Sequence, residues 1–171
     1  MHAEGETWIH VDLERQELLL YAGREVQARW PVSTALNGPG ECVDSGCTPR
    51  GEHRVRLRIG QGCPLNTVFV ARRPTGEIYD ESLCEAFPTR DWILTRILWL
   101  TGTEHGFNRG RDCDTLRRFI YIHGCPDHEP MGVPVSHGCV RMRNHDIVQL
   151  FDRVATGTRV VIGELPQVRD D

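Results

Sequence analysis

Lysine is absent from this chain, and all 20 of its basic residues are arginines. The absence excludes Schiff-base catalysis and the P-loop of nucleotide hydrolases, because both need a lysine amine. With 24 acidic residues the formal net charge is −4, which argues against a nucleic-acid partner, since nucleic acids favour a basic face. Long apolar runs are also missing. The run 97–100 is far shorter than the roughly 18 residues of a membrane span, so no span is expected.

The seven cysteines lack the spacings of the common cysteine sites. They are Cys42, Cys47, Cys63, Cys84, Cys113, Cys125 and Cys139. Without a C-x-x-C pair or an H-E-x-x-H run, neither a thioredoxin-like site nor a familiar zinc site is predicted. The pairing of these thiols is left open, with a local Cys42–Cys47 disulfide favoured if the protein is exported. Residues 1–13 lack the basic and apolar regions of a signal peptide, so no export signal is expected.

Hydrophobic alternation predicts strands along most of the chain. The predicted strands are 7–13, 17–21, 25–34, 52–59, 67–71, 118–124 and 158–162, with a weaker preference for a strand at 91–100. Segments 37–51 and 101–114 are rich in glycine and polar residues and are expected to be loops.

One amphipathic helix is expected near the C-terminus. Asn144 suits its N-cap, and apolar residues then recur at helical spacing from Ile147 to Val154. Strands with one main α-helix predict a mostly β fold, either a sandwich or a partly open barrel. The length indicates a single domain over residues 1–171, with its core at about 7–163.

Two His-Gly-Cys triplets, beginning at His123 and His137, contain the candidate catalytic groups. Cys139 precedes the predicted helix, whose positive end, together with Arg141, would lower the thiol pKa. Gly138 leaves room for a substrate backbone, and the amides of this run could face a developing oxyanion. A cysteine nucleophile needs a base, and His123 is best placed because it ends a strand.

Residues 136–142 read Ser-His-Gly-Cys-Val-Arg-Met and follow a strand that ends in His-Gly. Together they resemble the signature of the L,D-transpeptidase catalytic (YkuD-like) family. The resemblance extends along the chain, where 8–35 is similar to the family's opening strands and 47–60 to its Thr-Pro-x-Gly loop and following strand. Residues 144–154 and 157–162 resemble its closing helix and strand, so nearly the whole chain is covered.

The resemblance implies a cysteine acyltransferase that acts on bacterial peptidoglycan, in cell-wall synthesis and cell shape. Cys139 would attack the amide between diaminopimelate and D-Ala of a tetrapeptide stem, and an amine acceptor would resolve the acyl-enzyme. His123 would be the general base, oriented by the backbone carbonyl of Gly124. His137, Gly138 and Cys139 would line the oxyanion site.

The remaining implications of the resemblance concern the substrate and its surroundings. Arg141 would hold the loop or a substrate carboxylate, and Ser136 would stabilise the turn at the substrate site. No cofactor and no metal are implied, and the expected partners are peptidoglycan stem peptides and carbapenem inhibitors. The substrate implies the periplasm or cell envelope. The family commonly has Thr at Cys125, which is expected to be inert, the alternative being a bridge to Cys139 that switches the enzyme off.

Three other functions stay open at this point. An L,D-carboxypeptidase would use the same acyl-enzyme with water as the acceptor. A zinc hydrolase would use His123, His128, His137 and a cysteine, although the usual zinc motifs are absent. A peptidoglycan-binding module without catalysis would share the fold, but it has no need of the intact Cys139, His123 and Arg141.

Overall fold

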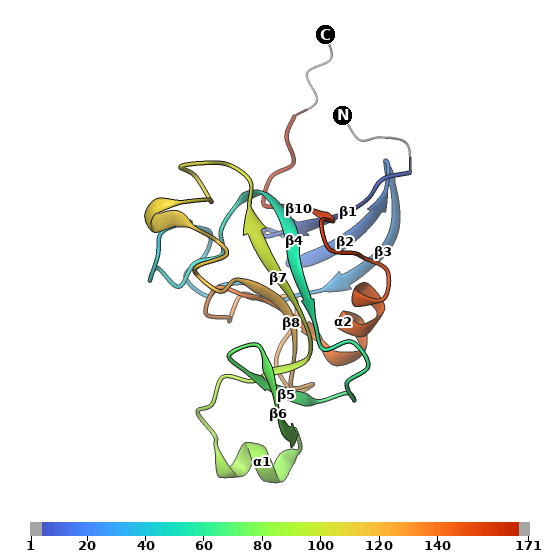
Figure 1. Cartoon of the computed structure of the whole chain (residues 1–171), viewed down its shortest axis with the longest axis vertical. Helices are drawn as coiled ribbons and strands as arrows, with labels where there is room; N and C mark the ends of the chain where they lie inside the picture. The colour runs from blue at the N-terminus through green and yellow to red at the C-terminus, as the bar shows by residue number, and fades with distance from the viewer. Residues whose placement is uncertain (1–4, 168–171) are drawn as a thin grey trace.

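The structure is a computed structural model that describes residues 5–167, and it is mostly β as predicted (Figure 1). In chain order its elements are β1 (Thr7–Asp12), β2 (Glu17–Ala22), β3 (Glu25–Pro31), β4 (Gly51–Ile59), β5 (Thr67–Val70), β6 (Arg73–Ile78), α1 (Glu81–Ala86), β7 (Ile93–Gly102), the 3-10 turn η1 (Arg111–Cys113), β8 (Tyr121–Cys125), β9 (Val140–Arg143), α2 (Asn144–Phe151) and β10 (Arg159–Ile162). Neither helix of the described part is long and apolar enough to cross a membrane.

The strands form one sheet in the order β3-β2-β1-β10-β4-β7-β5-β6, from which β8 branches off β7 and carries β9. Most neighbours are antiparallel, whereas β1 with β10 and β8 with β9 pair in parallel. The sheet curls, and α2 lies in its hollow between β2 and β3 on one side and β7 and β8 on the other (Figure 1). The expected partly open barrel is therefore present.

The apolar alternation that predicted the strands also decides which side chains fill the hollow of the sheet. Ile122 of β8 packs in the main core, together with the buried face of α2 formed by Ile147, Leu150 and Phe151. Side chains alternate across a strand, so Tyr121 and its neighbours on the other face lie outside this core. They pack in a smaller cluster that Cys139 also touches. The candidate residues therefore occupy the face of β8 that points away from the main core.

Two strands and one α-helix were not predicted, and none of them has an apolar pattern of ordinary length. β6 contains Pro74 and Gly76 and shows no apolar alternation, and α1 has six residues, none of them buried. β9 has only four residues, and three of them belong to the Ser-His-Gly-Cys-Val-Arg-Met motif. The predicted strand 118–124 starts instead at Tyr121, because Phe119 takes a positive φ of 57°.

The predicted start of the C-terminal helix is wrong by one residue. Arg143 occupies the N-cap position without a side-chain cap, and Asn144 is the first helical residue. The Asn144 side chain is used elsewhere, in the hydrogen bonds that support β8. The helix ends at Phe151, so Val154 lies beyond it, although Val154 still packs in the core.

The alternation of β4 is interrupted by a bulge between Val55 and Leu57. Leu57, which the pattern places inward, is 41% exposed. Arg58 turns towards α2, where it donates to the Phe151 carbonyl over 2.6 Å and stacks on the ring of that residue. The arginine row of this strand is therefore only partly a solvated face.

Candidate active site

Strands β8 and β9 bring the two candidate catalytic residues together. They pair in parallel, with Ile122 opposite Val140 and His123 opposite Arg141. This pairing places Cys139, the residue before β9, beside the strand that carries His123. Both side chains line one pocket of about 330 Å³. The loop between the two triplets therefore brings its two ends together, as predicted from the motif.

The Cys139 thiol lies against the backbone at the start of β8. Its Sγ accepts a hydrogen bond from the Tyr121 N–H over 3.3 Å and donates to the Phe119 carbonyl over 3.4 Å. Burial raises the pKa of Cys139 to about 11, while the Tyr121 N–H and the charges of Arg141 and Arg118 act in the opposite direction. The thiol is therefore protonated at pH 7 in the resting site.

The prediction that Cys139 has a lowered thiol pKa is wrong, because burial raises it. Along the chain, the four residues of β9 separate Cys139 from the first residue of α2. Arg141 does act in the predicted direction, but burial outweighs it.

The imidazole of His123 is held in one orientation. Its Nδ1 lies 2.7 Å from the Gly124 carbonyl oxygen, the contact expected for it. A carbonyl can only accept, so the neutral ring carries its proton on Nδ1 and leaves Nε2 with a free lone pair. The side chain is 2% exposed, and burial lowers its pKa. His123 is therefore neutral at pH 7 and has an atom able to take a proton.

The loop that ends at Cys139 is shaped by its own side chains and by residues 47–48. Ser136 is buried, where its Oγ donates to the Cys139 carbonyl over 2.6 Å and accepts from the Gly138 N–H over 3.2 Å. Gly138 has a φ of +133°, and a Cβ there would lie 3.2 Å from the Cys47 carbonyl oxygen. Thr48 donates to the Gly138 carbonyl over 2.8 Å. Ser136 thus stabilises the turn, and glycine is needed at 138.

Arg141 is neutralised by two carboxylates. Its guanidinium lies 3.1 Å from Asp91 and 3.8 Å from Glu129, and only 8% of the residue is exposed. The exposed His137 lies 3.5 Å from the second oxygen of Asp91. Arg141, Asp91 and His137 line both the pocket of Cys139 and an adjoining pocket of about 220 Å³. Of the two roles expected for Arg141, these contacts favour holding the loop.

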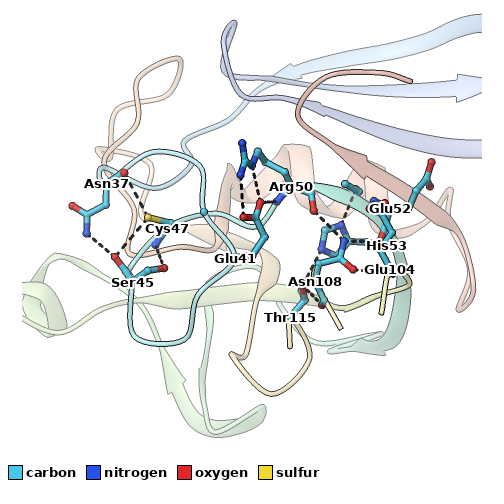
Figure 2. Close-up of polar contacts among 12 residues, drawn as sticks. Asn37, Glu41, Ser45, Cys47, Arg50, Glu52, His53, Glu104, Asn108 and Thr115 are labelled. Atoms are coloured by element: carbon cyan, nitrogen blue, oxygen red, sulfur yellow. Dashed lines mark hydrogen bonds and ion pairs between the residues drawn. The ribbon is translucent and has the colours of Figure 1, made fainter. Parts of the chain in front are cut away.

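The predicted loop 37–51 ends one residue earlier, because β4 begins at Gly51, and side-chain contacts hold its conformation (Figure 2). Arg50 forms a two-pronged ion pair with Glu41 at 2.7 and 3.0 Å. Arg118 donates to the Cys47 carbonyl over 2.7 Å and to Ser45 Oγ over 3.3 Å. Because Arg118 also lines the Cys139 pocket, these bonds join the loop to the site.

His53 belongs to a buried polar network at the base of β4 (Figure 2). Its Nδ1 lies 3.0 Å from the Gly51 carbonyl oxygen, and its Nε2 lies 3.0 Å from Thr115 Oγ1. Asn108 joins the same group, since its Nδ2 donates to the Glu52 carbonyl over 3.0 Å. Burial lowers the pKa of His53 to about 4. His53 therefore stays neutral and ties β4 to the loop before β8.

A second buried network, missed in the sequence, supports the end of β8. Asn144 accepts a hydrogen bond from Thr95 Oγ1 and donates to Asn66 Oδ1 over 2.9 Å and to the Cys125 carbonyl over 3.0 Å. A Cβ at Gly124 would lie 2.6 Å from Asn144 Oδ1. The only sequence signal was the position of Asn144 after the motif, and it was interpreted as a helix cap.

All seven cysteines are free thiols in the structure. Cys125 is 1% exposed, its Sγ lies 3.4 Å from the Met142 carbonyl oxygen, and burial raises its pKa to about 12. These features are those of an inert thiol. Within residues 5–167 no three His, Cys, Asp or Glu side chains gather as metal ligands, so the zinc alternative finds no ligand set there.

Fold and site define a class of protein: a curled β-sheet in which a parallel strand pair brings a cysteine and a histidine into one pocket. The family model of the L,D-transpeptidase catalytic domain, YkuD, matches residues 6–162. The chain belongs to this family, and the predicted resemblance is confirmed.

Individual relatives agree with this assignment. YqjB of Bacillus subtilis (strain 168), which bears an L,D-transpeptidase name, is 47% identical over 159 residues, or 92% of this chain and 72% of the relative. YbiS of Escherichia coli (strain K12), also named as an L,D-transpeptidase, is 54% identical over 45 residues, which are 26% of this chain and 15% of the relative. The chain thus matches only a small part of that curated relative.

The solved structures support the fold. L,D-transpeptidase 3 from Mycobacterium tuberculosis, in complex with a faropenem-derived adduct, superposes with a TM-score of 0.57 at 14% identity. The match covers 92% of this chain and 60% of that one.

Proposed function

We propose that the chain is a cysteine-dependent peptidoglycan L,D-transpeptidase with Cys139 as nucleophile and His123 as general base. The donor is a tetrapeptide stem, cut at the amide between diaminopimelate and D-Ala. The observation that carries the proposal is the pair itself, in which a protonated thiol and a neutral imidazole with a free Nε2 share one pocket. The protein would act where peptidoglycan lies, in the periplasm or cell envelope.

The first half-reaction transfers the acyl group to sulfur. His123 Nε2 takes the thiol proton as Sγ of Cys139 forms a bond to the amide carbon. When the tetrahedral intermediate collapses, the C–N bond breaks and the imidazolium gives its proton to the departing D-Ala amine. A thioester remains on Cys139. A neutral base with a lowered pKa suits this step, since it is ready to accept a proton at neutral pH.

The second half-reaction returns the enzyme to its starting state. An acceptor amine attacks the thioester carbon and passes a proton to His123 Nε2, and the C–S bond then breaks. The leaving sulfur takes that proton back, so thiol and imidazole are both restored. Water in place of the amine gives the carboxypeptidase outcome by the same steps. The second pocket beside Asp91 and His137 favours transfer, because an acceptor needs a site of its own.

The oxyanion would be stabilised by backbone amides of the motif. The Gly138 N–H already donates to Ser136, which leaves the amides of His137 and Cys139 as the proposed donors. Arg141 and Ser136 would act by keeping this loop in place, because both are engaged with protein groups.

Intact mass after incubation with imipenem tests the nucleophile, since carbapenems should acylate an activated Cys139. We expect one adduct on the native chain and on Cys42→Ala, a matched variant that removes an exposed thiol, and none on Cys139→Ala. An adduct that persists in Cys139→Ala would overturn the assignment.

Incubation with a tetrapeptide stem then tests the reaction. Release of D-Ala with a cross-linked product indicates transfer, whereas release with a free tripeptide indicates hydrolysis. A Cys139→Ala protein that still binds stems, beside a native chain that releases no D-Ala, would support the binding-module alternative instead.

A further inference from the structure

Arg72 stands at the edge of the Cys139 pocket in an unusual setting. It occupies the two-residue turn between β5 and β6, where both Ala71 and Arg72 take positive φ values of 48° and 65°. This left-handed conformation is uncommon for residues other than glycine. The turn directs the Arg72 side chain over β8, and the guanidinium lines the same pocket as Cys139 and His123.

Three aromatic side chains hold the guanidinium in place. It lies 4.9 Å from the ring centre of Trp99 and 4.7 Å from that of Phe119. Its Nη1 donates to the hydroxyl of Tyr121 over 3.1 Å. Tyr121 is also the residue whose N–H contacts the Cys139 thiol, so one tyrosine side chain separates the guanidinium from the nucleophile. The charge is therefore held in place at the pocket that Cys139 also lines.

Within residues 5–167, no carboxylate forms an ion pair with Arg72. The hydrogen bond to Tyr121 occupies one of the five guanidinium N–H donors. Asp91, the acid that lines the same pocket, is engaged by Arg141 and His137. The Arg72 guanidinium is thus held in place and is not neutralised by an ion pair with a carboxylate of the described residues. Its planar N–H donors can bind a carboxylate through two parallel hydrogen bonds.

We propose that Arg72, stacked on Trp99 and Phe119, forms a subsite that binds a carboxylate of the donor substrate. The inference rests on the proposed function, because stem peptides are the substrates that would bring carboxylates into this pocket. Three carboxylates of a tetrapeptide stem qualify: the C-terminal one of the leaving D-Ala, the free one of the D-glutamyl residue and the one at the D-centre of diaminopimelate.

Binding to the full-length Cys139→Ser protein tests the subsite without turnover. We expect Arg72→Gln to weaken binding of the tetrapeptide about 10-fold or more in calorimetry, the factor typical of a lost charge-assisted hydrogen bond. Arg73→Gln is the matched control, since it removes the exposed neighbouring arginine at the start of β6. It should change the dissociation constant less than about twofold, as for an exposed surface charge. An Arg72→Gln protein that binds as tightly as its parent overturns the subsite.

Singly amidated peptides identify the carboxylate. Amidation of the recognised group should weaken binding to the Arg72 protein by the factor seen for Arg72→Gln, and should have no further effect on Arg72→Gln itself. The two other amidations should act equally on both proteins. If all three act equally on both, Arg72 does not recognise the substrate and the inference fails.

Turnover separates this inference from the proposed function. In the native chain, Arg72→Gln should raise KM with a smaller effect on kcat, and alkylation of Cys139 by uncharged iodoacetamide should keep its rate. Equal kcat/KM for native and Arg72→Gln proteins would remove the subsite and leave the transpeptidase intact. If the native chain binds stems in an Arg72-dependent way but never releases D-Ala, the subsite stands and the proposed transpeptidase function fails.

Discussion

At the scale of single residues, burial moves the pKa of Cys139 up and the pKa of His123 down. Both shifts favour the uncharged pair, so the resting site holds a thiol and an imidazole. A thiolate–imidazolium pair would need an environment that stabilises both charges, and the nearby Arg141 is already neutralised by Asp91 and Glu129. In the mechanism that we propose, the thiolate would therefore form as proton transfer accompanies attack.

Alkylation of Cys139, which is partly exposed, should follow the titration of a thiol whose pKa is raised. Because its pKa is raised to about 11, the iodoacetamide rate measured on the Cys139 peptide by mass spectrometry should climb about tenfold per pH unit from pH 7 to 10. His123→Gln should give the same profile, since a neutral imidazole does not stabilise the thiolate, while losing turnover. A plateau in the native rate between pH 6 and 8 would instead indicate a preformed ion pair.

The sequence predicts Cys139 and His123 as the reacting pair, and the structure brings both to one pocket, but their electrostatics were not readable from the sequence. Cys139 and His123 stand in a local motif, and a motif specifies residue types at fixed spacing. The sign of the Cys139 shift depends on how deeply the thiol is covered by β8, which no local spacing reports. Arg72 was missed for the same reason, because its pocket is formed by residues distant in the chain.

At the scale of elements, the parallel β8–β9 pair brings His123 and Cys139 to one pocket, and Asn144 supports the end of that pair. Its amide binds the Cys125 carbonyl at the end of β8, the Thr95 hydroxyl on β7 and the Asn66 side chain before β5. Two strands, α2 and the residue that precedes β5 therefore meet at one buried amide. Removing it leaves several buried polar groups without partners.

Asn144→Ala should destabilise the protein by about 2–3 kcal/mol in urea unfolding, the cost of unsatisfied buried polar groups. It should also lower the rate of D-Ala release, because the end of β8 carries His123. His145→Ala is the control, since the neighbouring side chain on the same helix is exposed, and it should change stability by less than about 0.5 kcal/mol. Equal stability of the two variants would contradict the role assigned to Asn144.

The elements that the sequence predicted correctly share one property, several apolar residues that reach the core. In β1 they are interrupted by polar residues, whereas in β2 and β10 they follow one another as a continuous run. β9 carries the same signal, since Val140 and Met142 are buried on alternate positions, but four residues are too short to stand out beside the motif. β6 and α1 bury almost nothing, so their conformation is set by the strands and loops around them.

At the scale of the whole molecule, long loops are fixed to the sheet by buried polar groups. His53 contacts Thr115 and Gly51, and Asn108 binds the Glu52 carbonyl, which connects β4 to the segment that leads into β8 (Figure 2). A histidine in this position must stay neutral, because its ring is fully buried. The stability of the fold is thereby linked to pH.

The free energy of unfolding should fall as the pH drops from about 6.5 towards 4. The pKa of His53 is near its ordinary 6.5 in the unfolded chain and about 4 in the folded one, so protons bind the unfolded state preferentially within this window. The loss amounts to about 3 kcal/mol, to which His123 adds in the same direction because its pKa is also lowered. Urea unfolding at pH 7.5, 6.5, 5.5 and 4.5 measures this loss of stability.

His53→Gln should flatten the dependence of the unfolding free energy on pH, whatever the stability of the variant itself. His105→Gln, which changes an exposed histidine, should leave that dependence unchanged. An identical slope in the native and His53→Gln proteins would show that other groups set the acid limit of the fold.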